Sequence, residues 1–240
     1  MKTARISVVL AFVLLLLPTM VVATDLSPTP TTSGPTGLIR MPTADVVPAR
    51  NFSIAADYGI NYRTNDSQIL YKVNLGTFKG VEIGVVGGSD PNTSQFREGV
   101  FINMKYSLST EDVPNPLRLA LGLENLASNS QTDVYMVATK YMSTGWVISF
   151  GFMGDFPRTG FRPLAVGGLA IPIGGSMIVG VGDILVGESL FQVNAGVRMS
   201  LTNGFDLLVN WVNIGEDPRQ RSPKDPRSFT FGISWLNPFI

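Results

Sequence analysis

The sequence predicts an all-β fold, an antiparallel up-and-down transmembrane β-barrel of about 12 strands (roughly 10–12) that follows a cleaved signal peptide. Three observations support this fold class. Large apolar residues alternate with small or polar ones from residue 51 onward, short connections alternate with longer ones, and the last strand is rich in aromatic residues. A helical period does not separate apolar from polar residues in this way.

The composition narrows the function classes. The chain has 240 residues, with 18 Lys+Arg against 18 Asp+Glu, no Cys and no His. The charged fraction of 15% is below the average of about 25% for soluble domains. Without His or Cys, imidazole-dependent hydrolysis, thiolate catalysis and most zinc sites are excluded. We therefore predict no enzyme, no catalytic residue, no cofactor and no metal. Because the sequence has no long basic or acidic run, we also predict no nucleic-acid partner.

The first 23 residues predict a secretory signal peptide. Lys2 and Arg5 supply the positive start, residues 6–17 form an apolar run, and the small residues before Ala23 suit a cleavage site. An apolar run of this length is short for a membrane-spanning helix, which needs about 20 residues. The mature protein is therefore expected to be exported.

Residues 24–50 form the next unit. They begin as a Pro/Thr/Ser-rich linker and continue into the octet GLIRMPTA at residues 37–44. This octet, followed closely by a first strand, resembles an element of the YjbH-like outer-membrane proteins. That family is associated with exopolysaccharide production and export, and the resemblance implies a short, single-unit member. The octet is expected to lie under the barrel or to enter its lumen as a plug.

The barrel is predicted over residues 51–240. In the first strand the even positions from Phe52 to Tyr62 are apolar, and the odd positions are small, polar or charged. About twelve such segments follow one another. They lie near 52–62, 67–76, 80–88, 98–108, 116–125, 132–142, 145–154, 162–172, 175–184, 189–201, 204–213 and 227–236. The segments near 132–142 and 162–172 alternate poorly, which leaves ten strands open as an alternative.

The lengths of the connections support a barrel. Longer polar connections follow the first, third, fifth, seventh and eleventh segments, and tight turns follow the second, sixth, eighth and tenth. The connection after the fourth segment, STEDVPNP, is an exception. Outer-membrane barrels combine short periplasmic turns with longer external loops. With an even strand number, both termini are expected in the periplasm and the protein in the cell outer membrane.

The C-terminal residues 227–240 predict the strand that closes the barrel. One face carries large apolar side chains and the other carries Ser228, Thr230, Gly232 and Ser234. The apolar face comprises Phe229, Phe231, Ile233, Trp235 and, beyond a break, Phe239. This pattern resembles the C-terminal signal that the barrel-assembly machinery reads, so that machinery and the lipid bilayer are the expected partners. Antiparallel pairing with the first strand removes both sheet edges.

The same alternation assigns charged side chains to the barrel interior. The candidate lumen charges are Asp57, Arg63, Lys72, Glu82, Lys105, Arg118, Glu124, Arg198 and Asp206. Both signs occur, so the simplest interpretation is a set of paired charges. A polar ligand tunnel lined by the cations is the alternative. A carboxylate pair for glycoside hydrolysis, such as Glu82 with Glu124 or Asp57, is not favoured by the spacing.

The favoured functional hypothesis is a non-enzymatic outer-membrane barrel that is accessory to exopolysaccharide secretion or envelope organisation. Polysaccharide or export components are the partners that the YjbH-like resemblance implies. Two alternatives stay open at this point: a small passive channel or ligand-binding barrel, and a soluble secreted β-sandwich.

Overall fold

The computed structural model describes residues 27–61, 67–89, 98–108, 117–126, 131–157, 160–174, 177–188, 190–201, 204–214 and 228–238. The predicted signal peptide, the lumen candidate Arg63 and the aromatic Phe239 lie outside these residues. No helix of the described part is long and apolar enough to cross a membrane.

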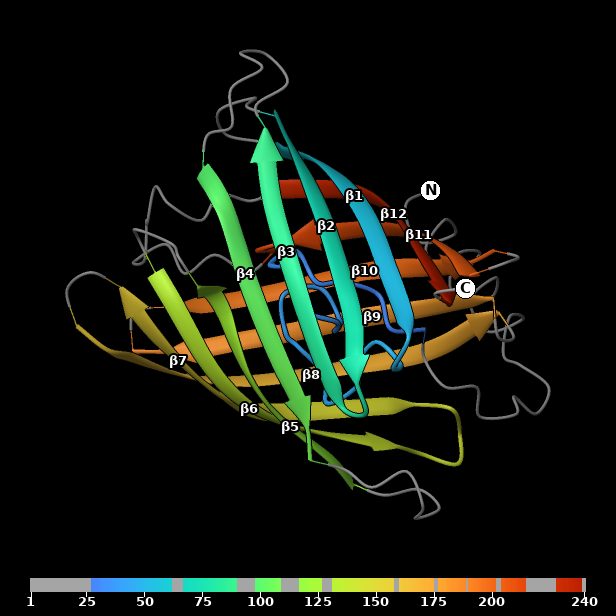
Figure 1. Cartoon of the computed structure of the whole chain (residues 1–240), viewed down its shortest axis with the longest axis horizontal. Helices are drawn as coiled ribbons and strands as arrows, with labels where there is room; N and C mark the ends of the chain where they lie inside the picture. The colour runs from blue at the N-terminus through green and yellow to red at the C-terminus, as the bar shows by residue number, and fades with distance from the viewer. Residues whose placement is uncertain are drawn as a thin grey trace, which may run out of the picture.

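The described chain forms twelve antiparallel strands in one closed sheet (Figure 1). Their bounds are β1 (Asn51–Asn61), β2 (Ser67–Phe78), β3 (Val81–Ser89), β4 (Glu98–Ser107), β5 (Leu117–Leu126), β6 (Gln131–Tyr141), β7 (Val147–Pro157), β8 (Arg162–Gly174), β9 (Ile178–Gly187), β10 (Phe191–Ser200), β11 (Phe205–Val212) and β12 (Ser228–Pro238). Each strand pairs with its neighbours in sequence, and β12 pairs with β1. This confirms the predicted up-and-down barrel, settles the strand number at twelve and excludes a two-sheet sandwich.

The closing contact between β1 and β12 extends over the full length of both strands. It runs from the pair Asn51↔Pro238 to the pair Asn61↔Ser228 without a register shift. Aromatic rings on the outer face span the same contact. The Trp235 ring lies 5.5 Å from the Phe52 ring in an edge-to-face arrangement and 5.5 Å from the Phe205 ring in a stacked one. The sheet therefore closes without an exposed edge, as predicted.

The two ends of the barrel differ in their connections. The turn end carries residues 79–80, 108–116, 142–146, 175–177 and 201–204, and the loop end carries residues 62–66, 90–97, 127–130, 158–161, 188–190 and 213–227. The predicted difference in length between the two ends is clear when the turn at residues 79–80 is compared with the connection at residues 213–227. It is wrong for the connections at 127–130 and 158–161. Both are short because the flanking strands extend further than predicted, β5 to Leu126 and β6 from Gln131, and β7 to Pro157 with β8 from Arg162. The exception predicted after the fourth strand is present at 108–116.

Side chains that face outward and side chains that face the lumen alternate along the strands, as predicted. Each of the twelve strands exposes at least one large apolar side chain on the outside, such as Ile54, Phe152 and Phe231. Inward positions such as Lys72, Glu82 and Arg198 are almost completely buried. Charged side chains are thus inside and apolar ones outside, the reverse of a soluble globular domain.

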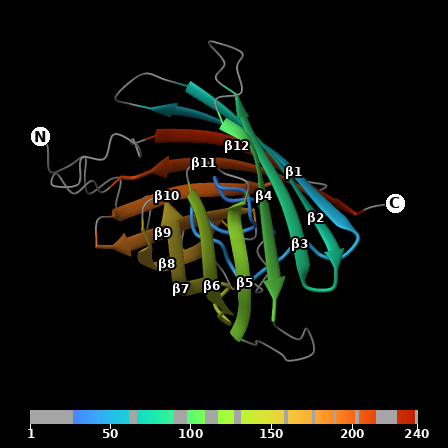
Figure 2. The same ribbon diagram turned by 60° about the vertical axis from the view of Figure 1, so that its left-hand side comes forward.

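The lumen is occupied by residues 27–50, which we call the inner segment. Figures 1 and 2 show it in blue, enclosed by the strands in two views that differ by 60°. Nine of its side chains, including Thr36, Met41 and Val47, are at most 2% exposed. The segment joins β1 at the turn end, where Arg50 N donates to Gly76 O over 2.8 Å.

We expect Trp235→Asp to impair barrel assembly, because the substitution removes two ring contacts and places a charge on the apolar outer face at the closing strand. Each such aromatic pair contributes about 0.5–1.5 kcal/mol. Trp235→Phe keeps a ring and should assemble nearly normally. The folded fraction is measured from heat-modifiable migration of membrane fractions on gels. Normal barrel levels in the Trp235→Asp variant would contradict a lipid-facing closing strand.

Candidate functional site: the filled lumen

The inner segment is folded against itself before it meets the barrel wall. Two short antiparallel bridges, Pro30↔Thr36 and Gly37↔Pro42, bend the chain back twice. Thr32 N donates to Ile39 O over 2.8 Å and Leu38 N donates to Met41 O over 2.9 Å. These bonds satisfy only part of the backbone, so the remaining N–H and C=O groups need partners on the wall.

Glu82 and Lys105, on the neighbouring strands β3 and β4, bind the segment at Thr36. Glu82 accepts hydrogen bonds from Thr36 N at 2.9 Å and from Val47 N at 2.8 Å, and the Thr36 hydroxyl lies 2.7 Å from its second oxygen. Lys105 Nζ donates to Thr36 O at 2.7 Å and lies 3.9 Å from Glu82 Oε1. Glu82 thus binds the N–H group of Thr36, and Lys105 binds its carbonyl group. The two charged side chains also pair with each other.

Asp183, in the middle of β9, binds three consecutive backbone amides. Its Oδ2 accepts from Ile39 N at 2.8 Å, Arg40 N at 2.7 Å and Met41 N at 2.9 Å. Successive amides that converge on one oxygen form an anion-binding nest. The other carboxylate oxygen accepts from Asn194 Nδ2 at 2.6 Å. The nest in the octet at residues 37–44 is therefore filled by a carboxylate of the barrel itself.

Carbonyl groups of the inner segment are bound by donors from other strands. Arg198 donates to Ser27 O and to Gly37 O, each at 3.0 Å. Asn74 donates to Gly34 O at 2.7 Å and Asn103 to Ser33 O at 3.0 Å. Cations and amide groups therefore face carbonyls, and carboxylates face N–H groups, as hydrogen-bond chemistry requires.

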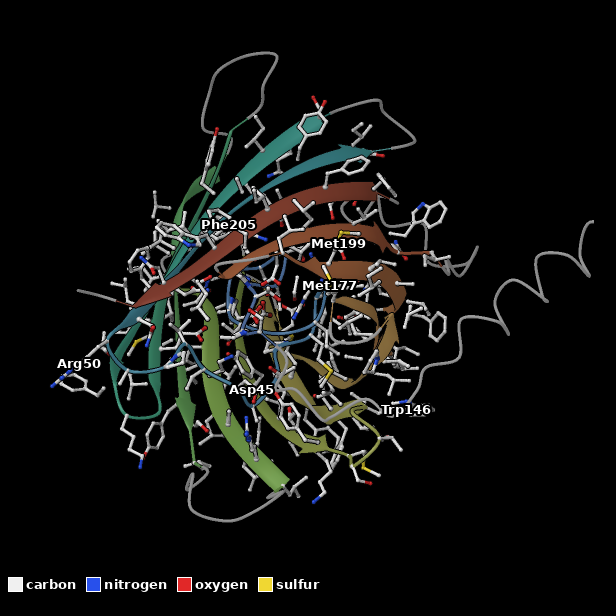
Figure 3. The ribbon with its side chains drawn as sticks, turned by 90° about the vertical axis from the view of Figure 1, so that its right-hand side faces the viewer. Asp45, Arg50, Trp146, Met177, Met199 and Phe205 are labelled. Atoms are coloured by element: carbon white, nitrogen blue, oxygen red, sulfur yellow. The ribbon has the colours of Figure 1, made fainter. Side chains whose placement is uncertain are left out.

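Asp45 of the inner segment binds two residues of the barrel wall where the lumen opens at the turn end. Arg118 Nη1 lies 2.7 Å from Asp45 Oδ1, and the Tyr141 hydroxyl donates to Asp45 Oδ2 at 2.8 Å. The Arg118 guanidinium also lies 4.5 Å from the centre of the Tyr141 ring, a cation–π distance. Figure 3 shows Asp45 on the blue segment within the ring of strands. The Arg118 side chain is 31% exposed, so this pair borders solvent.

The opposite side of the inner segment packs against an apolar wall. Leu38, Ile39, Met41 and Ala44 each belong to a buried apolar cluster. Their partners come mostly from β6 to β9 and include Tyr135, Val137, Tyr141, Val147, Met153, Leu164, Val166, Ala170, Val179, Val181 and Leu185. This wall explains the poor alternation near 132–142 and 162–172. Most positions on both faces of β6 and β8 are apolar, because one face points outward and the other packs against the inner segment.

Gly76 permits the close approach where the inner segment leaves the lumen. A Cβ at Gly76 would lie 2.0 Å from Pro48 O and 2.5 Å from Val47 O, which are rigid backbone atoms. No side chain fits between β2 and the segment at this point. The inner segment is thus packed directly on the strand backbone.

The structure places the other predicted lumen charges as follows. Lys72 forms a buried ion pair with Asp57. Asp206 accepts from the Ser200 hydroxyl at 2.6 Å. Glu124 is buried opposite Asp133 on β6, which in turn lies opposite Asp155 on β7. Within the described ranges, no group of three or more His, Cys, Asp or Glu residues is arranged to hold a metal ion.

Sequence reasoning missed Asp183, which accepts three hydrogen bonds from the inner segment, as many as Glu82 does. Both alternating sets of positions in β9 are apolar, namely Val179–Val181–Leu185 and Ile178–Ile184. The alternation therefore does not show whether Asp183 faces the lumen or the outside. It also missed the neutral donors Asn74, Asn103 and Asn194. A polar residue within an otherwise apolar strand is the signal that could have identified Asp183.

Comparisons with known proteins show no family. No protein-family model and no curated protein matches the chain. Among solved structures, the translocator domain of the autotransporter NalP from Neisseria meningitidis is similar, with a TM-score of 0.43 and 10% identity over 77% of this chain and 86% of that one. A de novo designed transmembrane β-barrel is similar with a TM-score of 0.27 and 9% identity, over 79% of this chain and 97% of that one.

We expect Asp183→Asn to destabilise the folded barrel by about 2–4 kcal/mol, because the nest loses its anion and an amide N–H₂ group faces other donors. The matched control is Asp206→Asn, a buried carboxylate on the same lumen wall for which the structure shows one hydrogen bond, from Ser200. That variant should lose about 1 kcal/mol. Urea unfolding followed by tryptophan fluorescence measures both. Equal losses would show that the nest contributes nothing specific.

Proposed function

We propose that the protein is a plugged, non-conducting outer-membrane β-barrel, with both termini in the periplasm and no enzymatic activity. The observation that carries this proposal is the inner segment, which lies in the lumen and is held there by hydrogen bonds to charged residues of the barrel wall. We propose further that the barrel is accessory to exopolysaccharide secretion or envelope organisation.

The outer surface supports insertion into a bilayer. Exposed apolar side chains occur on all twelve strands, including Phe152 at 68%, Trp211 at 54% and Phe150 at 53% exposed. Monomeric soluble proteins rarely expose contiguous apolar patches larger than a few hundred Å². Strands of this length, tilted by about 40°, span roughly 25 Å, which matches the apolar band of outer-membrane barrels.

Aromatic side chains at both ends of the strands support the same placement. Phe52, Trp235 and Phe205 cluster at the turn end. At the loop end, the Trp211 ring lies 5.7 Å from Phe229, and the Phe156 ring lies 5.0 Å from Phe161. Aromatic girdles of this kind mark the two membrane–water interfaces.

The proposed role in exopolysaccharide secretion, with polysaccharide or export components as partners, is based on the octet at residues 37–44. Its resemblance to the YjbH-like proteins supports a role beside polysaccharide or export components. The octet lies in the lumen, where Asp183 and Arg198 bind it. In this proposal it acts as the structural element that keeps the barrel closed, and any partner binds the barrel from outside the lumen.

We expect the purified protein to show no steady conductance in planar lipid bilayers, because the inner segment occupies the lumen and is buried against its wall. A variant that lacks residues 29–47 should conduct, since the charged wall would then line a water-filled lumen. Heat-modifiable migration confirms that each preparation is folded. A steady open level in the intact protein would overturn the plugged barrel in favour of a passive channel.

We expect Phe231→Arg to destabilise the barrel in vesicles by about 2–4 kcal/mol, the cost of a cation near the bilayer midplane. The matched control is Ser67→Arg at the loop-end start of β2, where the cost should be about 0–1 kcal/mol. Urea unfolding from vesicles measures both. In a water-soluble barrel an exposed Phe231→Arg would change stability by only about 0.5 kcal/mol, and that result would contradict membrane insertion.

A further inference from the structure

Three carboxyl groups lie side by side on the lumen wall near the loop end. Glu124 on β5 pairs with Asp133 on β6, and Asp133 pairs with Asp155 on β7, in the register of the sheet. Their exposed fractions are 2%, 3% and 6%. Like charges directly opposite each other destabilise a pair of strands, and burial increases this cost because water does not screen the charges. The row therefore needs a compensating positive charge.

Asp133 and Asp155 are in direct contact. The side chain of Asp155 is hydrogen-bonded to the side chain of Asp133. An ionised carboxylate only accepts hydrogen bonds, so a bond between two carboxyl groups requires a proton on one of them. Two carboxyl groups that share a buried position do not both ionise readily, because the two negative charges repel each other.

The packing around the row selects a proton over a larger cation. Asp155 Oδ1, Glu124 Oε1 and the Tyr135 hydroxyl are inaccessible to water, and none of them has a hydrogen-bond partner among the described residues. Tyr135 lies on the same face of β6 as Asp133, and its ring covers Gly122 beside Glu124, where a Cβ would overlap the Tyr135 hydroxyl. A metal ion needs several oxygen ligands around it, whereas a proton fits between two oxygen atoms in contact.

The charged groups around the row lie at its two ends. Those described are Arg40 of the inner segment, Glu82 on β3, Lys105 on β4 and Arg162 on β8. Arg40 and Lys105 act on Glu124, and Arg162 lies opposite Asp155 but is exposed, so water screens it. The connections next to β4 and β7 add Asp90, Arg97 and Arg158, which lie outside the described residues. The described cations thus border the row, and the contact between the two aspartates is left to a proton.

A path of hydrogen bonds links this contact to the inner segment. Asn125 Nδ2 donates to Asp133 Oδ2 over 2.9 Å, and Asn125 N donates to Asn103 Oδ1 over 3.0 Å. Asn103 Nδ2 donates in turn to Ser33 O over 3.0 Å. Asn125 has a left-handed backbone with φ of 58°, within the part of β5 where the register with β4 shifts. The aspartate contact therefore belongs to the same network that holds the turn of the inner segment at Ser33.

We infer that Asp133 and Asp155 bind one proton between them at mildly acidic pH, where an exposed carboxyl group is already ionised, and that this proton stabilises the closed lumen. The shared proton converts a repulsive pair into a hydrogen bond between β6 and β7. Loss of the proton leaves two negative charges facing each other in a buried position. The inference concerns the lumen wall and does not depend on the proposed partners of the barrel.

Infrared spectroscopy of the purified full chain in detergent micelles tests the proton directly. At about pH 5.5, exposed carboxyl groups are ionised because they titrate near about pH 4. The intact protein should still show the C=O absorption of a protonated carboxyl group, and this band should disappear as the pH rises to about 9. Aspartate labelled with carbon-13 shifts the band and separates it from any contribution of Glu124. Asp155→Asn should remove the aspartate band. The matched control Asp206→Asn, a buried carboxylate that accepts from Ser200, should keep it.

The pH dependence of unfolding tests the contribution of the proton to stability. Above about pH 5 the unfolded chain has released this proton and the folded state still holds it, so the folded state binds more protons and its stability falls as the pH rises. The folding equilibrium constant of the intact protein should therefore fall, relative to that of Asp155→Asn, by up to about tenfold per pH unit until the folded pair ionises. Contributions of Lys72 and Lys105 are common to both proteins and cancel. Urea unfolding followed by tryptophan fluorescence measures both.

Each outcome decides for or against the shared proton. Absence of a protonated aspartate band from the intact protein at about pH 5.5 would overturn the inference. So would a band that persists in Asp155→Asn, an equal loss of the band in Asp206→Asn, or parallel pH profiles of stability for the intact protein and Asp155→Asn. Heat-modifiable migration confirms that each preparation is folded. Asp133→Asn, which removes the other half of the pair, provides the same comparison should Asp155→Asn fail to fold.

Discussion

The structure depends on hydrogen bonds between the barrel wall and the backbone of residues 27–50. A peptide segment inside a closed sheet has polar groups that neither water nor a neighbouring strand can satisfy. Glu82 and Asp183 supply acceptors for its N–H groups, and Lys105 and Arg198 supply donors for its carbonyls. Each charge is thereby bound several times, which offsets the free-energy cost of removing it from water.

This constraint divides the lumen into two halves. The polar half comprises β1 to β4 with β10 to β12, where charged and amide side chains bind the inner segment or one another. The mostly apolar half comprises β6 to β9, where the wall packs against Leu38, Ile39, Met41 and Ala44. Asp183 is the charged residue of this half that binds the inner segment. The inner segment therefore contacts a mostly polar wall on one side and a mostly apolar wall on the other.

Much of the fold could be predicted because a barrel strand has one apolar face for lipid and a different face for the lumen. That alternation predicted all twelve strands to within about three residues at most ends, and it assigned Lys72, Glu82 and Arg198 to the interior. It failed in β6, β8 and β9, because their lumen-facing positions pack against the inner segment and are mostly apolar as well. The partners of Glu82 and Lys105 could not be predicted, because a period of two identifies a face and not the distant residue that fills it.

The binding of charged side chains to the backbone of the inner segment determines how this segment is held in the lumen. Two side chains in an ion pair can exchange partners, whereas a carboxylate that binds three consecutive amides has one position in which all three bonds form. Asp183 therefore fixes the axial position of residues 39–41, and Glu82 with Lys105 fixes Thr36 on the opposite wall. Withdrawal of the segment breaks both sets of bonds at once and exposes the apolar half of the wall. The inner segment is accordingly part of the barrel's core, and closure of the lumen is a property of the folded state.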